Sequence, residues 1–350
     1  MTRGTDPRPL MRRLFEPRRL DTMAPAPRIF TYAVLGLWTL IVLFPIYWVL
    51  VTSFKIELQV DSGPYYLPFV DFQPTLDAWT FMLLQNNTLG PYLNSIVVAL
   101  ASTFLALLIG SLAAYALVRI RFQVKLAAVV TFIVLVVGVI VAVEALDVPW
   151  PAALVAAIVL LLLALNTYVR RFNAAAGNND IEFWMISNRI MPPIVAVLPI
   201  YVMFQHLKLL DTQIALISTY TGVNLPIVVW LTRDFFAGIP LDLEESAEID
   251  GASKFRVFFT IALPLVRSGL VATFMLVLIL TWNEFLLALF LSNANAQTMP
   301  VLVAAQNTTR GPQWWYMSVL IVIMIAPVIA IAGLLQKHIA RGLLVGAVKG

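Results

Sequence analysis

Long apolar runs constrain the fold of this chain more than any other feature of its sequence. A helix that crosses a membrane needs about 20 apolar residues. Only 12% of the 350 residues are charged, whereas a soluble domain carries roughly a quarter. We therefore predict an all-α integral membrane protein. Its eight expected spans are residues 31–53, 93–118, 126–143, 151–169, 184–205, 213–232, 268–290 and 315–336.

Basic residues lie on one side of this predicted membrane. They follow the second, fourth, sixth and eighth runs, and seven arginines crowd residues 1–28. The opposite loops are acidic or neutral, apart from Lys55 and Arg310. By the positive-inside rule we expect both termini in the cytoplasm and interpret residues 1–28 as a cytoplasmic tail. That tail offers too few aromatic residues to stack on bases, so we expect no nucleic-acid partner.

A charged segment, Asp242 to Pro264, separates the sixth run from the seventh. Five of its first nine residues are carboxylates, too many for a lipid-facing helix, so we place the segment in water. Its spacing predicts two short helices that break at Gly251, because glycine readily takes the left-handed conformation that ends a helix. A structured elbow of this kind indicates a docking surface for a soluble partner, since a merely solvated loop needs no helical spacing. The second helix would turn an apolar face toward the membrane helices, formed by Phe255, Val257, Phe258 and Ile261.

Three groups of residues in this elbow resemble the EAA loop of ABC importer permeases. They are Glu245-Ser246-Ala247, Asp250-Gly251-Ala252 and Leu263-Pro264. Ser246 stands where alanine is usual. Landmarks over about residues 29–125 and 181–350 resemble the MalG-like inner-membrane subunits of carbohydrate importers. These landmarks are Asn94-Ser95, Ser111 to Ala116, Arg189 to Pro193, Pro199 to Tyr201, Asn224 to Pro226, Thr281 to Phe285 and Gly346 to Gly350.

The resemblance implies a fold and an organisation. It implies the six-helix core of an ABC type I importer permease, to which this chain adds a two-helix transmembrane hairpin. Residues 29–125 would hold the first two spans with an outward loop at 54–92, and residues 181–350 would form the rest of the core. A cytoplasmic coupling loop at residues 233–267 would seat on the ATPase. The residues assigned to that contact are Glu245, Ser246, Ala247, Asp250, Gly251, Ala252, Leu263 and Pro264.

The resemblance also implies a function and partners. The chain would be the permease subunit of an ATP-driven importer of a sugar, oligosaccharide or polyol, in a bacterial cytoplasmic (inner) membrane. Its partners would be a cytoplasmic ABC ATPase dimer, a second homologous permease, an extracytoplasmic substrate-binding protein and membrane lipid. ATP and Mg would bind the ATPase, and this chain would bind no cofactor or metal and catalyse no reaction. Its sequence has no G-x-x-x-x-G-K-[ST] nucleotide motif.

Residues 126–180 depart from the six-span pattern. They contain two extra apolar runs, both rich in Val, Ile, Leu and Ala, whereas a transport path needs polar groups. We therefore interpret them as a lipid-facing hairpin packed against the periphery of the core rather than as a pore element. Residues 171–182 read as a flexible linker that returns to the core. An even number of added spans returns the chain to the same side of the membrane, so the expected orientation of the later spans is unchanged.

Polar residues within the seventh run are candidates for the substrate pathway. An ionisable group inside a membrane span is a functional-site hypothesis by default, and Glu284 lies within this run. Together with Trp282 and Asn283 it offers the carboxylate, amide and aromatic face that bind sugars. The same residues could instead form an interhelical contact or a gate, and we leave both readings open. Asn94 and Arg189 are weaker candidates.

Two other functions are disfavoured. A self-sufficient secondary transporter would show internal repeats and several buried ionisable residues for ion coupling, and the sequence offers no clear repeat. An intramembrane enzyme would need a catalytic motif, but neither H-E-x-x-H nor G-x-S-x-G occurs. Two histidines and no cysteine cannot build a multi-histidine or thiolate metal site.

Overall fold

The computed structural model describes residues 9, 11, 15, 24–190, 192–309 and 311–347, without the side chains of residues 144, 189, 190 and 335–347. Most of the predicted cytoplasmic tail therefore lies outside the described residues, and so does Arg310. The chain divides into two compact units. One comprises residues 1–89 and 302–327, and the other comprises residues 90–301 and 328–350.

The first unit contains one long apolar helix followed by short elements. In this unit the surroundings of Lys55 explain why a basic residue occurs among the loops that were expected to be acidic or neutral. Lys55 is only 2% exposed, its Nζ donates to the Tyr65 carbonyl at 2.7 Å, and it lies 4.3 Å from the Trp48 ring centre. Burial lowers the pKa of Lys55, and the nearby Asp71 carboxylate opposes that shift. The elements are α2 (Pro25–Thr52), α3 (Glu57–Asp61), α4 (Asp77–Thr80), the π-helix η1 (Phe81–Gln85) and the antiparallel strands β3 (Asn307–Thr308) and β4 (Gly311–Pro312).

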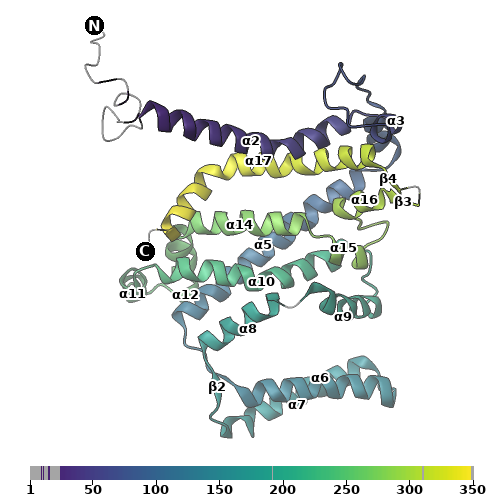
Figure 1. The fold of residues 1–350 in the computed structure, drawn as a ribbon. Coiled ribbons are helices and arrows are strands. Elements are labelled where there is room, and N and C mark those ends of the chain that lie inside the picture. The colour runs from purple at the N-terminus through teal and green to yellow at the C-terminus, as the bar shows by residue number, and fades with distance from the viewer. Residues whose placement is uncertain are drawn as a thin grey trace. The chain divides into compact units, whose positions relative to one another are not determined.

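The second unit is a bundle of helices with one short two-stranded ribbon, β1–β2, at the base of the α6–α7 pair (Figure 1). The boundaries at residues 301/302 and 327/328 fall inside two helices, α16 (Met299–Ala305) and α17 (Trp314–Ala347), so each of these helices belongs partly to both units. The remaining elements, in chain order, are α5 (Leu89–Arg119), β1 (Val124–Lys125), α6 (Leu126–Leu146), α7 (Trp150–Asn166), the 3-10 turn η2 (Val169–Arg171), β2 (Ala175–Ala176), α8 (Asn178–Ile190), α9 (Pro193–His206), α10 (Gln213–Ala237), α11 (Leu241–Ile249), α12 (Lys254–Val257), the π-helix η3 (Phe258–Ala262), α13 (Leu263–Leu265), α14 (Arg267–Trp282) and α15 (Leu286–Leu291).

The predicted spans are confirmed where a single helix suffices. Within the described residues, six helices (α2, α5, α6, α7, α10 and α17) are long and apolar enough to cross a membrane, and two bent pairs raise the number to as many as eight. The predicted span at 184–205 falls on one of these bent pairs. That segment bends by 88° between Asn188 and Pro193, because proline lacks the N–H and excludes the helical conformation at the residue before it.

The seventh predicted span is also broken. Helix α14 ends at Trp282 and α15 begins at Leu286, so Glu284 lies at a helix break and not within a continuous helix. The side chain of Asn283 donates to the Ile279 carbonyl at 2.8 Å, and Glu284 accepts from the Leu287 backbone N–H at 3.0 Å. Such side-chain bonds to the backbone compete with helix continuation.

Helix α10 is the centre of the second unit and packs against α8, α14 and α15. Two glycines permit close approach to it. A Cβ on Gly110 of α5 would lie 2.5 Å from Val228, and one on Gly269 of α14 would lie 2.5 Å from the Phe235 ring. Buried apolar clusters surround both halves of α10, one including Leu216 and the other including Phe236.

A carboxylate secures the turn between α9 and α10. Asp211 accepts backbone N–H groups from Asn293, Asn295 and Ala296 at 2.7–3.2 Å. Burial raises the pKa of Asp211, but the donors of Ala296, Asn293 and Asn295 together outweigh burial and hold the pKa below its usual value. Asp211 thereby ties residues 293–296 to the start of α10.

The inserted segment forms a hairpin of α6 and α7, which we call the hairpin. Its two ends meet in the ribbon β1–β2, the neck, where Val124 pairs with Ala176 and Lys125 with Ala175. Asn178 fixes the neck to α5, because its Nδ2 donates to the carbonyls of Leu117 and Ile120 at 2.5 and 2.7 Å.

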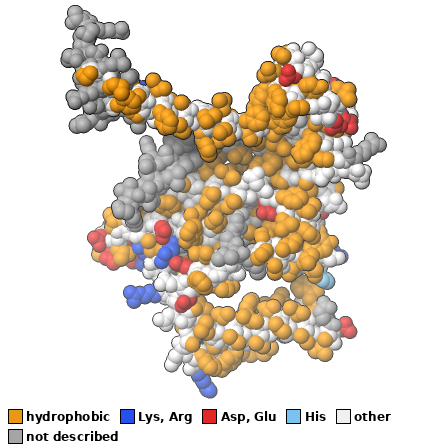
Figure 2. Space-filling view, viewed as in Figure 1, with side chains coloured by type: hydrophobic (Ala, Val, Ile, Leu, Met, Phe, Trp, Pro, Cys, Tyr) orange, Lys and Arg blue, Asp and Glu red, His pale blue; other side chains and the backbone are white. Residues whose placement is uncertain are grey.

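Two expectations for the insertion change. Residues 171–182 are not an irregular linker, since they contain β2 and the start of α8. The hairpin is peripheral, but it does not pack broadly on the core. Its helices pack mainly against each other, and Figure 2 shows hydrophobic side chains along it.

Candidate functional site

The charged elbow folds as its sequence predicts. Helix α11 ends before Asp250, and Gly251 takes a φ of +86°, which lies in the left-handed region that glycine favours. Ala252 N–H bonds back to the Ala247 carbonyl at 2.9 Å, and the Ser253 hydroxyl accepts from the Arg256 N–H at the start of α12. The prediction of two short helices with a break at Gly251 is therefore confirmed.

One elbow carboxylate is buried, which the sequence reasoning missed. Glu244 is 4% exposed. Its Oε1 accepts from Arg119 Nε and Nη2 at 2.9 and 2.7 Å, and its Oε2 accepts from the Tyr115 hydroxyl at 2.7 Å. Arg119 Nη2 also donates to the carbonyls of Phe236 and Ile239 at 3.2 and 2.9 Å. We call this arrangement of Tyr115, Arg119 and Glu244 the clamp.

The clamp joins three segments. Arg119 lies in the last turn of α5, Phe236 and Ile239 at the end of α10, and Glu244 in the first half of α11. A sequence signal for it exists, because Tyr115 and Arg119 are four residues apart and share one face of a helix. Glu244 and Glu245 are adjacent, so on a helix their side chains point about 100° apart. One can enter the protein while the other stays in water.

Aromatic side chains pack against the clamp. Phe258 is 1% exposed, and its ring centre lies 5.1 Å from that of Tyr115 and 5.8 Å from that of Phe236. Val257 is also buried, as expected, but the same expectation is wrong for Phe255, which is 70% exposed. The π-helix η3 begins at Phe258, so the face of the second helix does not continue in simple 3.6-residue register.

The outer face of the elbow carries the residues that the motif singles out. Glu245, Ser246, Asp250 and Gly251 are exposed, and Ala247 and Ala252 are half-buried. Leu263 is half-buried and Pro264 is exposed. Two large apolar side chains flank this face, Ile249 at 86% and Phe255 at 70% exposure. Exposed apolar side chains beside polar ones are typical of a protein interaction site.

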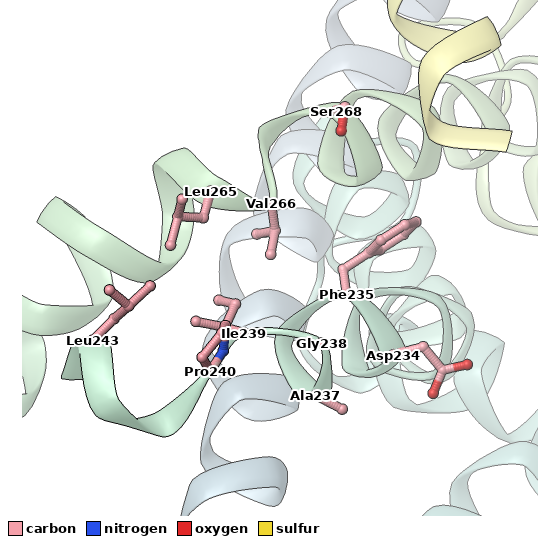
Figure 3. Close-up of a pocket in the computed structure, with 10 residues that line it drawn as sticks. All are labelled: Asp234, Phe235, Ala237, Gly238, Ile239, Pro240, Leu243, Leu265, Val266 and Ser268. Atoms are coloured by element: carbon pink, nitrogen blue, oxygen red, sulfur yellow. The ribbon is translucent and has the colours of Figure 1, made fainter. Parts of the chain in front are cut away.

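A groove of about 640 Å³ runs beside the elbow (Figure 3). Leu243 of α11 lies on one side of it and Phe235 of α10 on the other. The groove separates α11 from the end of α10, so the two segments meet mainly through the clamp and not through continuous packing. The lining residues are Asp234, Phe235, Ala237, Gly238, Ile239, Pro240, Leu243, Leu265, Val266 and Ser268.

A second cavity, of about 430 Å³, contains Glu284. Asn188 and Gly222 also line it, together with Pro193 and Pro226. The cavity therefore combines a carboxylate, an amide and two prolines, one at the start of α9 and one inside α10. A carboxylate and an amide can bond the hydroxyl groups of a polar solute.

The other pathway candidates lie in different surroundings. Trp282 is 6% exposed and meets the edge of Tyr92, and Asn283 bonds its own helix. Asn94 donates to the carbonyls of Asn295 and Gln297 at 2.8 and 3.1 Å. Its carbonyl accepts from Gln213 at 2.6 Å.

Asn94 thus has both amide hydrogens and its acceptor in use within the protein, which favours a structural role. The side chain of Arg189 lies outside the described residues. An interhelical hydrogen bond was the alternative role for Trp282, Asn283 and Glu284. Such a bond is present at the residue before Trp282, where the Asn224 side chain of α10 donates to the Thr281 hydroxyl at 3.0 Å.

These features define a multi-pass membrane protein of apolar helices with a structured, charged elbow between two of them. Residues 181–345 match the family described as binding-protein-dependent transport system inner membrane component. The probable ABC transporter permease protein y4oR of Sinorhizobium fredii is 30% identical, over 89% of this chain and 95% of its own length. The trehalose/maltose transport system permease protein MalG of Thermococcus litoralis is 30% identical, over 90% of this chain and 94% of its own.

The fold is similar to that of a solved bacterial ABC transporter involved in the import of the acidic polysaccharide alginate. The TM-score is 0.56 at 20% identity, over 90% of this chain and 98% of that one. The chain belongs to the ABC transporter permeases of the binding-protein-dependent type and is MalG-like.

Proposed function

We propose that this chain is a permease subunit of an ATP-driven carbohydrate importer, and that its elbow couples a cytoplasmic ATPase to the membrane helices. The observation that carries the proposal is the division of the elbow into two faces. Glu244 is buried in the clamp, whereas Glu245, Ile249 and Phe255 remain exposed. A segment fixed on one side and open on the other is suited to receive a partner and pass on its movement.

The clamp supplies the mechanical link. A partner that seats on the outer face of the elbow would move α11 as a unit. Because the Glu244 carboxylate is bonded to Arg119 and Tyr115, that movement reaches α5, and Phe258 carries it to α10 through Phe236. Rigid-body transmission of this kind opens and closes a transport path alternately.

The cavity at Glu284 is the proposed part of the substrate pathway in this subunit. Its carboxylate and the Asn188 amide face a space of about 430 Å³, and both groups bond hydroxyls. The relatives named above include a trehalose/maltose permease, and the solved structure belongs to an alginate importer. These names support a sugar, an oligosaccharide or a polyol as the substrate class.

The proposal requires partners. The ATPase dimer would hold ATP and Mg, a second homologous permease would complete the pathway, and a substrate-binding protein would deliver the solute to the outer side. The coupling contact would comprise Glu245, Ser246, Ala247, Asp250, Gly251, Ala252, Leu263 and Pro264. Both termini would then lie in the cytoplasm, on the side of the elbow.

Co-purification tests the proposal. The tagged chain, solubilised gently from its native membrane, is expected to bring down an ATPase and a second permease. Glu245→Lys and Gly251→Pro should abolish recovery of the ATPase while the chain stays in the membrane. Glu57→Lys, an equal charge reversal at an exposed position of the outward loop, is the matched control. A chain that purifies alone and transports solute without ATP in vesicles would establish a secondary transporter instead.

A further inference from the structure

The hairpin has features that neither coupling nor the substrate pathway uses. An added pair of spans that only filled space in lipid would need a smooth apolar surface. Instead, a groove of about 560 Å³ opens between α6 and α7. Its lining residues are Leu126, Ala127, Val130, Thr131, Val134, Leu135, Leu160, Ala164, Tyr168, Phe172 and Ala174.

The groove is apolar along most of its length and polar at one level. Val130 and Val134 on its wall are 60% and 61% exposed, so apolar side chains line an open channel. At the polar level the hydroxyls of Thr131 and Tyr168 are hydrogen-bonded to each other. Thr131 is a polar residue inside a run that the sequence reasoning treated as uniformly apolar.

Three basic residues, which we call the rim, are next in sequence to groove-lining residues at the neck: Lys125 precedes Leu126, and Arg170 and Arg171 lie between Tyr168 and Phe172. Lys125 Nζ donates to the Arg170 carbonyl at 2.7 Å, and Arg170 Nη2 donates to Asn166 at 3.0 Å. Arg170 and Arg171 are exposed, and neither pairs with a carboxylate among the residues that the structure describes. Figure 2 shows positively charged side chains toward the neck end of the hairpin and an acidic one at its far end.

The order of these groups along α6 matches the order of groups in a phospholipid. Lys125 precedes Thr131 by six residues, which is about 9 Å along a helix. A phosphate at the level of the basic rim would therefore place its glycerol esters near the two hydroxyls and its acyl chain beyond them, along Val134 and Leu135. Basic pockets at helix ends on the cytoplasmic side bind anionic head groups.

We propose that this groove binds an anionic phospholipid, with its phosphate held by Arg170 and Arg171 and one acyl chain between α6 and α7. Guanidinium groups bond phosphate oxygens in a fixed fork geometry. The charge of the rim distinguishes this site from ordinary lipid contact, which would not select an anionic head group. The assignment depends on the groove and its rim, and it stands whether or not the chain is a carbohydrate importer.

The test uses the full-length chain, purified in detergent and stripped of native lipid. Native mass spectrometry would compare binding of phosphatidylglycerol with that of phosphatidylcholine of the same acyl composition. We expect phosphatidylglycerol to bind at least tenfold more tightly. Each lost arginine should weaken phosphatidylglycerol binding about fivefold, so Arg170→Gln with Arg171→Gln should weaken it about 25-fold. The same double variant should weaken phosphatidylcholine binding less, because the choline cation already offsets the charge of its phosphate.

Two further variants separate the parts of the site. Val134→Trp, at an exposed position of the wall, should fill the groove and weaken binding of both lipids while the arginines remain. Lys208→Gln removes one charge at an exposed position far along the sequence from the hairpin and should have no effect, whereas Arg171→Gln alone should show the fivefold loss. Size-exclusion and helical content confirm that each variant is folded.

Three results would overturn the proposal. The first is equal affinity for the two lipids, and the second is unchanged phosphatidylglycerol binding in the double arginine variant. The third is full competition by soluble glycerol phosphate, which would assign the rim to a free anion and leave the groove without a ligand.

Discussion

The elbow and the hairpin are attached to the protein in opposite ways. The elbow is charged and mostly exposed, yet it buries one carboxylate, Glu244, against Arg119 at 2.7 Å. The hairpin is apolar and mostly exposed, and it joins the core through the neck and the Asn178 side chain. A buried ion pair transmits force because it cannot slip without leaving an unpaired charge. The neck consists of two residue pairs, and the hairpin helices pack mainly against each other, so the hairpin has few points of attachment to the core.

The largest expected effect is the loss of folding stability when the clamp is removed. Arg119→Ala or Glu244→Ala leaves a buried charge without its partner, which costs about 3–5 kcal/mol. Glu245→Ala, one residue away and exposed, is the control and should change stability by less than about 0.5 kcal/mol. Thermal unfolding of the purified chain measures both. Equal stability of the Glu244 and Glu245 variants would erase the distinction between the two faces of the elbow.

A smaller effect is expected at Asp211, which fixes the turn between α9 and α10 as Glu244 fixes the elbow. Asp211→Asn should cost about 1–2 kcal/mol at neutral pH, because hydrogen bonds to a charged acceptor are lost. The pKa of Asp211 is lowered in the folded chain, so its contribution is present above the unfolded value of about 3.9 and is lost as the pH falls through the folded value.

The measurement for Asp211 is the difference in unfolding temperature between the native chain and the Asn variant. That difference should be full at pH 7 and shrink as the pH is lowered below about 4. A difference that stays constant with pH would show that the carboxylate charge is not what holds the turn.

Phe255 sharpens the comparison because its effect should be confined to partner binding. Phe255 is 70% exposed, so Phe255→Ala should change stability by less than about 0.5 kcal/mol. Removal of a large apolar side chain from a docking face should weaken ATPase binding about tenfold or more. Leu58→Ala, at an equally exposed position in the loop of residues 54–92, is the matched control. A fall in stability with normal ATPase binding would place Phe255 in the packing of the elbow.

The smallest effect is expected from removing the hairpin. Replacing residues 126–174 by Asn-Gly would close β1 and β2 with a two-residue turn suited to antiparallel strands. Because the hairpin packs mainly on itself, uptake by the shortened chain should stay within about twofold of the native rate, while its preference for anionic phospholipid disappears. An altered substrate range would show that the hairpin belongs to the transport path.

Local features were predictable from the sequence, and contacts between distant residues were not. The helix break at Gly251 was predictable from neighbouring residues alone, because glycine adopts a positive φ at low cost. The direction of Glu244 depends on Arg119, 125 residues earlier, and nothing in its immediate sequence separates it from Glu245. Phe255 is exposed although Val257 and Phe258 beside it are buried, and the π-helix that begins at Phe258 interrupts the simple helical register on which the prediction of one apolar face relied.

The same contrast explains the errors at the seventh run and at the neck. Hydropathy averaged over a span does not register a single side-chain bond, such as that of Asn283 to the Ile279 carbonyl, so the seventh run read as continuous. The neck consists of two residue pairs about 50 positions apart in sequence, and residues 171–182 therefore resembled a linker. The pathway role of Glu284 stays a prediction, and the cavity beside it gives that prediction a defined place.

The C-terminal end of α5 carries the attachment of both regions. Arg119 is bonded to the elbow, and the carbonyls of Leu117 and Ile120 on either side of it are bonded to Asn178 at the neck. Two ligands that act on one helix end are thermodynamically linked, and linkage is reciprocal. If lipid bound at the hairpin changes the affinity of the elbow for its ATPase by some factor, ATPase binding must change the affinity for that lipid by the same factor. The lipid composition of the membrane would then affect transport, and the last turn of α5 would be the point at which the two binding events are coupled.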